Sequence, residues 1–399
     1  METIKLKEHE SQIVSLTAGQ AEAIATAHRK LKVSGRLGLP GEFELYADGV
    51  VGRVELGTLS IVIEPKIPLS SLLFMMAYTV DAKPWRSIAT VGVERDLLEA
   101  IAAVFGQELT SAFSRGLVRN YRVTQAALPL VRGRVRTQEQ VRKWFGRMPP
   151  VECEYDEFTE DILENRLLLA ALRRLRHVPV RNRQARSQLR RAEEELSGVT
   201  AMELRGEDAD QVVFTRLNDR LRRAVKLSRM ILDSFSVTLS GKSSTGSWGF
   251  LLDVAPVFEL FVVTALRDAL RGSPVTVPFG KGSRYLDHAS EMRVVPDLLF
   301  VTEAEPVAVG DVKYKRTVGD AAKEPDVYQV LAYMRAFGTA DAFLVYPRGR
   351  VDATRIHRLR DSSERLHVVA LDLDRGPSAL LLEIRQLAAS ITRAVAVSA

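Results

Sequence analysis

The stretch Val294-Val295-Pro296-Asp297, followed after a short interval by Gly310-Asp311-Val312-Lys313, decides the fold of the C-terminal part of this 399-residue chain. Each segment lies in an apolar run, 293–301 or 307–314, with the length and valine content that predict a β-strand. The link between the runs, 302–306, is short and polar, as a hairpin loop should be. The sequence therefore predicts two neighbouring antiparallel strands.

The predicted hairpin gathers two carboxylates and an ammonium group. Asp297 and Asp311 would lie close together, and Lys313, two residues after Asp311, would leave the same face of the sheet. Val312 would point the other way, into a core. Mg²⁺ typically takes one or two carboxylates together with phosphate oxygens, and a neighbouring lysine can stabilise phosphoryl charge. The cluster favours Mg²⁺-dependent phosphodiester cleavage, and a simple ion pair on a hairpin face is the alternative.

A helix is predicted after the second strand. The apolar spacing of 326–338 is helical, and Gly338 is a suitable stop. Gln329 and Tyr333 are four residues apart and therefore share one face of this helix.

A second helix, about 254–270, is predicted upstream, with Asp253 as its cap. Glu259 is the lone acidic residue on its early, apolar part. A carboxylate in apolar surroundings needs a partner or a metal ion. Taken by itself, Glu259 is explained more simply as a surface residue on an amphipathic helix.

This order of elements resembles the PD-(D/E)xK nuclease fold, and the Gln-x-x-x-Tyr helix resembles its RecB-type branch. More closely, the chain is similar to the McrC family, the nuclease subunit of the McrBC modified-cytosine restriction system. The resemblance covers roughly residues 40–345. The segments that carry it are Val51-Gly52-Arg53-Val54, Ile63-Glu64-Pro65-Lys66-Ile67, Arg132-Gly133-Arg134, Tyr155-Asp156-Glu157-Phe158-Thr159-Glu160-Asp161, Asn165-Arg166, Phe258-Glu259-Leu260-Phe261-Val262, Pro296-Asp297, Asp311-Val312-Lys313-Tyr314 and Tyr328-Gln329-Val330-Leu331-Ala332-Tyr333.

The resemblance implies a Mg²⁺-dependent endonuclease, with Mn²⁺ as a substitute metal. The expected metal ligands are Asp297, Asp311, the Val312 carbonyl and Glu259, the last directly or through water. Lys313 would orient the nucleophile and stabilise the transition state. Gln329 and Tyr333 would support the site or hold the phosphate backbone.

The resemblance also implies an oligomeric, McrB-like AAA+ GTPase that translocates DNA and whose hydrolysis the nuclease subunit stimulates. The N-terminal region would contact this motor, with the loop 35–41 and its adjoining strands as candidates. The substrate would be double-stranded, methylated DNA. Cutting both strands requires two nuclease sites and hence association of two copies.

Composition agrees with a globular protein of two or three domains, with 46% hydrophobic residues. The single cysteine, Cys153, excludes a disulfide framework and a cysteine-type metal site. The N-terminus lacks an apolar signal core, and no run approaches the ~20 apolar residues that span a bilayer. We therefore expect a cytoplasmic protein without membrane association.

The net charge of +6 is a modest excess, but its distribution points to DNA. The run 172–191 contains eight arginines and no acidic residue, which suits phosphate contacts, and a solvated helical face is the alternative. The candidate DNA-binding residues are Arg181, Arg183 and Arg186 in this run, with Lys281, Arg284 and Lys315 near the proposed site.

The predicted fold class is a multidomain α+β protein. Residues 1–85 would form a small α+β domain, 86–240 a mainly helical basic region, and 248–399 an α/β nuclease domain of the PD-(D/E)xK type. The further predicted elements are helices at 18–31, 95–115, 160–176, 212–232 and 379–397, and strands at 42–47, 49–56, 58–64, 117–128, 341–346 and 366–373.

Two other motifs fail on inspection. Gly241-Lys242-Ser243 resembles the end of a P-loop, but the glycine required five residues earlier is Ser236. The six histidines show no metal-ligand spacing, and His288, the only one near the proposed site, fits a loop residue better than a catalytic base.

Two alternatives remain open at this stage. One is a non-enzymatic adapter that keeps the nuclease fold as a DNA-binding or motor-activating scaffold. The other is a stand-alone, RecB-like exonuclease. The intact set Asp297, Asp311 and Lys313 argues against the first, and the large segment before residue 240 argues against the second.

Overall fold

The computed structural model describes residues 2–27, 29–36, 38–80, 97–236, 248–278, 282–314, 324–348 and 354–398. The chain forms two compact units. One comprises Met1–Leu97 and Ser236–Ala399, and the other comprises Leu98–Phe235, so the boundary falls within β10 (Phe235–Ser236). Within the described residues, no helix has both the length and the apolar content needed to cross a membrane.

The N-terminal part of the first unit is built on a mixed sheet with the strand order β1-β6-β5-β11-β10, of which the first four strands lie wholly in this unit. β1 runs parallel to β6, whereas β5 is antiparallel to both β6 and β11. A second antiparallel sheet has the order β2-β4-β3. The bounds are β1 (Glu2–Lys7), β2 (Ser11–Ser15), α1 (Ala18–Ala27), β3 (Leu31–Gly35), β4 (Glu42–Ala47), β5 (Val50–Leu56), β6 (Leu59–Glu64), α2 (Leu69–Val80) and β11 (Trp248–Asp253).

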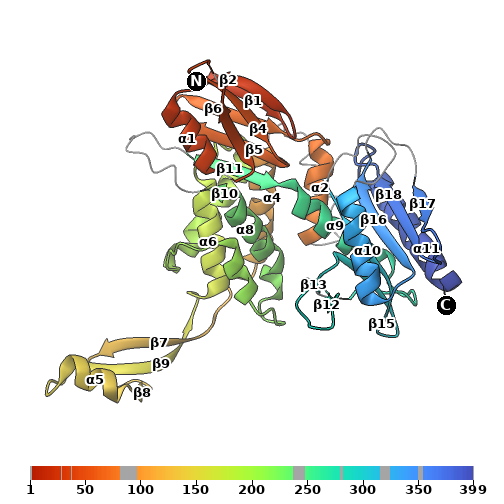
Figure 1. Cartoon of the computed structure of the whole chain (residues 1–399). Coiled ribbons are helices and arrows are strands. Elements are labelled where there is room, and N and C mark those ends of the chain that lie inside the picture. Colours follow the sequence, from red (N-terminus) through yellow and green to blue (C-terminus); the bar gives the residue numbers. More distant parts are fainter. Residues whose placement is uncertain are drawn as a thin grey trace. The chain divides into compact units, whose positions relative to one another are not determined.

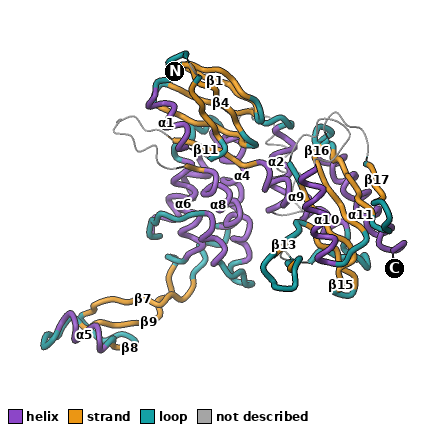
Figure 2. Tube along the Cα trace, viewed as in Figure 1, coloured by secondary structure: helices purple, strands orange, loops and turns teal. Residues whose placement is uncertain are grey.

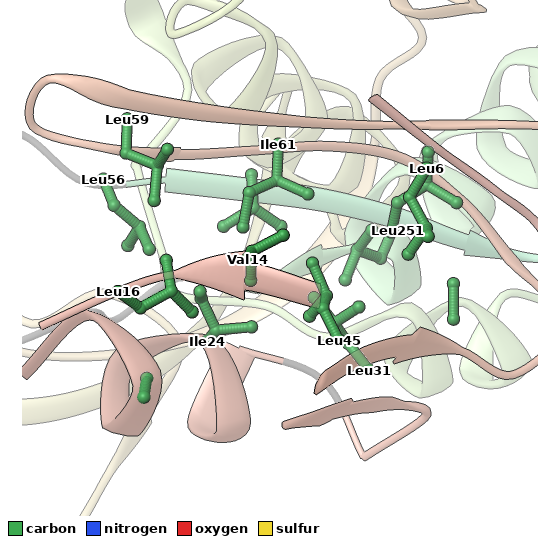
Figure 3. Packing of buried hydrophobic residues seen from close by; sticks show 14 of the residues in the cluster. Leu6, Val14, Leu16, Ile24, Leu31, Leu45, Leu56, Leu59, Ile61 and Leu251 are labelled. Atoms are coloured by element: carbon green, nitrogen blue, oxygen red, sulfur yellow. The ribbon is translucent and has the colours of Figure 1, made fainter. Parts of the chain in front are cut away.

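One apolar core holds these two sheets and α1 together (Figure 3). It includes Leu251, so a strand from the second half of the sequence completes the N-terminal core. The strands predicted at 42–47, 49–56 and 58–64 are confirmed as β4, β5 and β6. The helix predicted to reach residue 31 is wrong at its end, because Leu31 already begins β3 and is buried in this core.

Gly52 is the position in this sheet where the backbone tolerates no side chain. Its φ is +142°, and a Cβ there would lie 2.0 Å from the Phe250 carbonyl oxygen on β11. We expect Gly52→Ala to separate β5 from β11 and to lower the free energy of unfolding by about 2–4 kcal/mol. Urea unfolding measures this, with Gly19→Ala as control because nothing lies within 4 Å of that position. Equal stability of both variants would contradict the prediction.

The C-terminal part of the first unit contains a sheet with the order β14-β15-β16-β18-β17. Figure 2 labels three of its strands, β15, β16 and β17. β15, β16 and β18 are parallel, and both edge strands are antiparallel. The bounds are α9 (Val254–Ala269), β12 (Arg284–Tyr285), β13 (Arg293–Val294), β14 (Leu298–Thr302), β15 (Glu305–Val312), α10 (Glu324–Phe337), β16 (Asp341–Pro347), β17 (Arg355–Arg358), β18 (Arg365–Leu371) and α11 (Pro377–Ser398).

Side-chain alternation assigns the faces of this sheet. Val309 on β15 packs with Val330 and Met334 of α10 in one core. Because side chains repeat every two residues, Asp311 lies on the same face as Val309 and so on the α10 side. α9 packs with α2 and α11.

The predicted hairpin exists, with one correction. The run 293–301 is two strands, β13 and β14, that pair with β12 and β15 respectively. Pro296 lies in the break and has no N–H to give to a strand ladder. The turn itself is Glu303-Ala304, both with positive φ (52° and 72°), as a two-residue hairpin of the I′ type requires.

The second unit combines helices with a β-hairpin arm. Its elements are α4 (Leu97–Ala112), β7 (Asn120–Leu128), β8 (Arg134–Val135), α5 (Thr137–Trp144), β9 (Val151–Thr159), α6 (Leu163–Leu175), α7 (Arg183–Glu195), η1 (Leu196–Gly198), η2 (Gly206–Gln211), η3 (Asp219–Leu221) and α8 (Arg222–Ser234). The helix predicted at 212–232 is wrong in its first part, because α8 begins only at Arg222. The sequence patterns also failed to predict β8, α5, β9 and α7.

The arm consists of β7, β9, β8 and α5, and within this unit it extends away from the helices (Figure 1). α5 has no buried residue. Large apolar side chains are exposed along the arm: Tyr121, Val123, Leu130, Val131, Val141, Phe145, Met148 and Phe158. The single cysteine, Cys153, is buried in β9.

Candidate active site

All six side chains predicted to form the site line one pocket of about 380 Å³ in the first unit. They come from the hairpin strands, from α9 and from α10. The residues are Glu259, Asp297, Asp311, Lys313, Gln329 and Tyr333. The fold therefore brings together groups that are up to 74 residues apart in the sequence.

The two aspartates face each other because of the β14–β15 register. Leu298 pairs with Gly310, so the preceding Asp297 lies opposite Asp311. The Val312 N–H donates to Asp297 Oδ2 at 3.1 Å, which fixes this carboxylate at the strand end. Asp311 is 1% exposed. Burial raises its pKa to about 7; the Lys313 ammonium opposes this rise and the Asp297 charge adds to it.

Lys313 carries the positive charge of the pocket. Its Nζ lies 2.6 Å from Asp311 Oδ2. Burial lowers the pKa of the Lys313 ammonium, but the carboxylates of Asp311, Asp297 and Asp326 outweigh burial and raise it. The Lys313 ammonium therefore brings a positive charge to the pocket at neutral pH.

α10 supplies a polar wall. Gln329 Nε2 donates to the Tyr333 hydroxyl at 2.6 Å, as the four-residue spacing on one helix face allows. Burial and the nearby Asp311 charge raise the pKa of Tyr333. Asp326, which no sequence pattern singled out, is 3% exposed and accepts a hydrogen bond from the Tyr346 hydroxyl at 3.0 Å.

α9 begins as predicted. Asp253 is its N-cap and accepts a hydrogen bond from the Ala255 N–H at 3.2 Å. Glu259, one turn further, is half-buried and lines the pocket.

The N-terminal region contributes part of the pocket wall, which no local pattern predicted. The contributing residues are His9, Lys30, Asp48 and Gly49. His9 has a φ of 57° and lies 3.5 Å from Glu8 and 3.8 Å from Asp48. Residues from both the N-terminal and the C-terminal part of this unit therefore line the pocket.

Comparison with known proteins now defines the family. The model of the "McrBC 5-methylcytosine restriction system component" family matches residues 45–347, more than half of the chain. The chain belongs to this family. No curated protein matches this chain in sequence.

A solved structure agrees with the fold of this McrBC-family chain. It is the refined half-complex from a tetradecameric assembly of Thermococcus gammatolerans McrB AAA+ hexamers with bound McrC. The match has a TM-score of 0.58 at 20% identity and covers 98% of this chain and 100% of the other. A cryo-EM structure of the Thermococcus gammatolerans McrBC complex also matches, with a TM-score of 0.39 at 24% identity, over 67% of this chain and 88% of the other.

The donor set of the McrBC-family pocket fits a hard divalent cation. Among the residues that the structure describes, no three His, Cys, Asp or Glu side chains are close enough to hold one metal ion. The acidic core is therefore the pair Asp297 and Asp311, with Glu259 elsewhere on the wall. Two carboxylates suffice for Mg²⁺, which keeps waters and takes phosphate oxygens as its other ligands.

The predicted DNA-binding residues of the McrBC-family chain fall into three groups. Arg284 is exposed on β12, with its guanidinium 5.2 Å from the centre of the Phe337 ring at the end of α10. Lys281 and Lys315 lie outside the described residues. Arg181, Arg183 and Arg186 are exposed on the second unit, whereas other arginines of that run pair with glutamates, namely Arg174, Arg176, Arg190 and Arg191.

Proposed function

We propose that this chain is the endonuclease subunit of a McrBC-type, modification-dependent restriction system. It would hydrolyse DNA phosphodiesters with Mg²⁺ when coupled to an McrB-like AAA+ GTPase, whose hydrolysis it would stimulate. The observation that carries the proposal is the convergence of Asp297, Asp311 and Lys313 in one pocket of a chain of this family. The similar half-complex, in which McrC is bound to McrB hexamers, supports the partner.

The residues of the pocket would divide the reaction between them. Asp297 and Asp311 would hold the metal ion, with the Val312 carbonyl and, through water, Glu259. Bound Mg²⁺ would supply charge neutralisation at the phosphate and a lowered pKa of the attacking water. Lys313 would place its positive charge beside the scissile phosphate and stabilise the transition state.

α10 would support this arrangement. The hydrogen bond from Gln329 fixes the Tyr333 hydroxyl in the pocket. That hydroxyl can donate to a phosphate oxygen of the DNA backbone, which orients the strand without reading its sequence.

Plasmid cleavage tests the proposal. Methylated and unmethylated plasmids are incubated with the chain and Mg²⁺, with and without an McrB-like AAA+ protein from the same organism and GTP or ATP. We expect cutting of methylated DNA only when metal, motor and nucleotide are all present. Cutting without the motor would instead identify a stand-alone exonuclease or endonuclease.

Two surfaces are candidates for the motor contact. The loop 35–41, between β3 and β4, follows from the family resemblance. The arm of the second unit has the stronger physical case, because a monomer rarely exposes so many large apolar side chains together. Before and after α5, the side chains of Leu130, Phe145 and Met148 are 79%, 83% and 71% exposed.

We expect the triple change Leu130→Ser, Phe145→Ser and Met148→Ser to reduce stimulation of the motor's hydrolysis by about tenfold or more, because apolar anchors dominate such interfaces. Folding should not change, since these side chains are exposed. Leu217→Ser is the matched control, because Leu217 is 80% exposed in the same unit but outside the arm. Unchanged stimulation by the triple variant, with a loss in Leu39→Ser, would move the contact to the loop 35–41.

The alternative to the proposed function is a non-enzymatic adapter that stimulates the motor. An adapter would stimulate the motor fully but leave plasmid uncut under every condition, so the same assay separates the two functions.

A further inference from the structure

Glu8, in the N-terminal region, contacts the end of the strand that carries the proposed site. It directly follows β1, is 0% exposed, and its N–H donates to the Glu64 carbonyl at 2.9 Å. Its Oε2 accepts a hydrogen bond from the Tyr314 hydroxyl at 3.1 Å and one from the Lys66 N–H at 3.3 Å. A residue next to the first strand thus holds a residue 306 positions away.

A carboxylate buried this completely is unfavourable for stability. Glu8 Oε1 accepts no hydrogen bond from any described residue, and the ring of His9 is 3.5 Å away. Leaving a buried polar atom unsatisfied costs about 1–3 kcal/mol, and such an atom in a folded protein calls for an explanation. Packing alone would be better served by an apolar side chain.

The contacts of Tyr314 show what the Glu8 carboxylate holds in place. It directly follows Lys313, whose N–H donates to the Val345 carbonyl at 2.9 Å and whose Nζ contacts Asp311. The Tyr314 ring also contacts the Phe258 ring, with centroids 5.8 Å apart, and Phe258 precedes Glu259 on α9. Fixing Tyr314 therefore fixes the backbone from which the Lys313 side chain enters the pocket.

We propose that Glu8 is a positioning residue of the nuclease site, which acts through the Tyr314 hydroxyl to hold Lys313 in place. The inference rests on the proposed function. It assigns the N-terminal region a role within the active site itself. A misplacement of about 1 Å at such a site reduces turnover by about a hundredfold.

The test compares Tyr314→Phe with a control variant that loses an equivalent hydrogen bond elsewhere in this unit. Tyr78→Phe removes another tyrosine–carboxylate hydrogen bond of this unit, from α2 to Asp268 on α9 at 3.2 Å. Plasmid cleavage with the motor present gives kcat and the KM for DNA. Hydrogen exchange of the peptide 307–314 in the metal-free chain reports the order of the strand end without any catalysis.

We expect Tyr314→Phe to lower kcat about ten- to a hundredfold at unchanged KM, and to accelerate exchange in the peptide 307–314. Tyr78→Phe should change only the melting temperature. Glu8→Gln keeps an acceptor oxygen for Tyr314 and should retain more activity than Glu8→Ala.

Two results would overturn the proposal: wild-type kcat and exchange in Tyr314→Phe, or equal losses in Tyr314→Phe and Tyr78→Phe. If the wild-type chain itself cuts no DNA, the proposed function fails together with the catalytic role. Exchange at 307–314 would then show separately whether Glu8 anchors the strand end.

Discussion

Asp311→Asn is expected to lower the rate of DNA cleavage by on the order of a thousandfold. The same change is expected to stabilise the metal-free protein. The loss follows from removing one of the two carboxylates proposed to hold Mg²⁺. The gain follows from the burial that raises the pKa of Asp311 from 3.8 to about 7. Above pH 7 the folded chain must keep a buried charge that the unfolded chain exposes to water.

The sign of this effect can be checked against pH. Between pH 4 and 7 the folded protein keeps the Asp311 proton that the unfolded chain has already released. Wild-type stability therefore falls as the pH rises through this window, whereas the asparagine variant lacks this dependence. We expect Asp311→Asn to be more stable by about 2–4 kcal/mol at pH 8 and to lose this advantage near pH 4.

Urea unfolding in EDTA at pH 8 and pH 4 measures the difference. Calorimetric titration with Mg²⁺ or Mn²⁺ should detect binding to the wild type and not to the variant. A variant less stable than wild type at pH 8 would show that Asp311 is held as a structural ion pair with Lys313, contrary to the proposed role.

The largest expected loss of stability is at Asp161, where the arm joins the helices of the second unit. Its carboxylate accepts hydrogen bonds from Arg166 at 2.6 and 2.7 Å, from Arg122 at 2.6 Å, and from the Thr200 hydroxyl at 2.7 Å. Arg122 lies on β7 and Arg166 on α6, so one buried carboxylate joins both elements.

These bonds stabilise the charged form. The hydrogen bonds from Arg166 hold the pKa of Asp161 well below its usual range, against the opposing effect of burial. The contribution to stability is present above the unfolded pKa, near 4, and is lost as the pH falls further. Asp161→Asn leaves two guanidinium groups without their carboxylate and should cost about 3–5 kcal/mol at pH 7.

Urea unfolding measures this loss, and limited proteolysis should show faster cleavage at the base of the arm. Asp219→Asn is the control, because Asp219 pairs with Arg222 on the surface, where an ion pair contributes little. A loss of less than about 1 kcal/mol in Asp161→Asn would mean that the arm is held by other contacts.

The local part of the fold was predictable because its signals are local. The cap at Asp253, the helix stop at Gly338 and the hairpin between Asp297 and Asp311 each depend on residues close in sequence. Gly338 has the positive φ of 66° that a helix end with glycine favours. The break at Pro296 was not predicted. Proline has no N–H for the strand ladder, so the first strand of the hairpin is divided there.

Long-range pairing and exposed strands were not predictable in this way. β11 pairs with β5 across about 200 residues of sequence, and no local pattern encodes this partner. Within the arm, β7 matches the strand predicted at 117–128, but β9 was missed, because only its first three residues are buried and the rest of it shows no buried apolar alternation. No local pattern predicted Glu8, His9 and Lys30 at the site, because their position there depends on the tertiary fold alone.

The decisive experiment follows plasmid cutting and nucleotide hydrolysis in one reaction, with methylated DNA, Mg²⁺, an McrB-like AAA+ protein from the same organism and either the wild-type chain or Asp311→Asn. We expect both chains to stimulate hydrolysis equally and only the wild type to cut. Cutting by Asp311→Asn at the wild-type rate, or stimulation by the wild type without any cutting, would contradict the assignment of this pocket as a nuclease site.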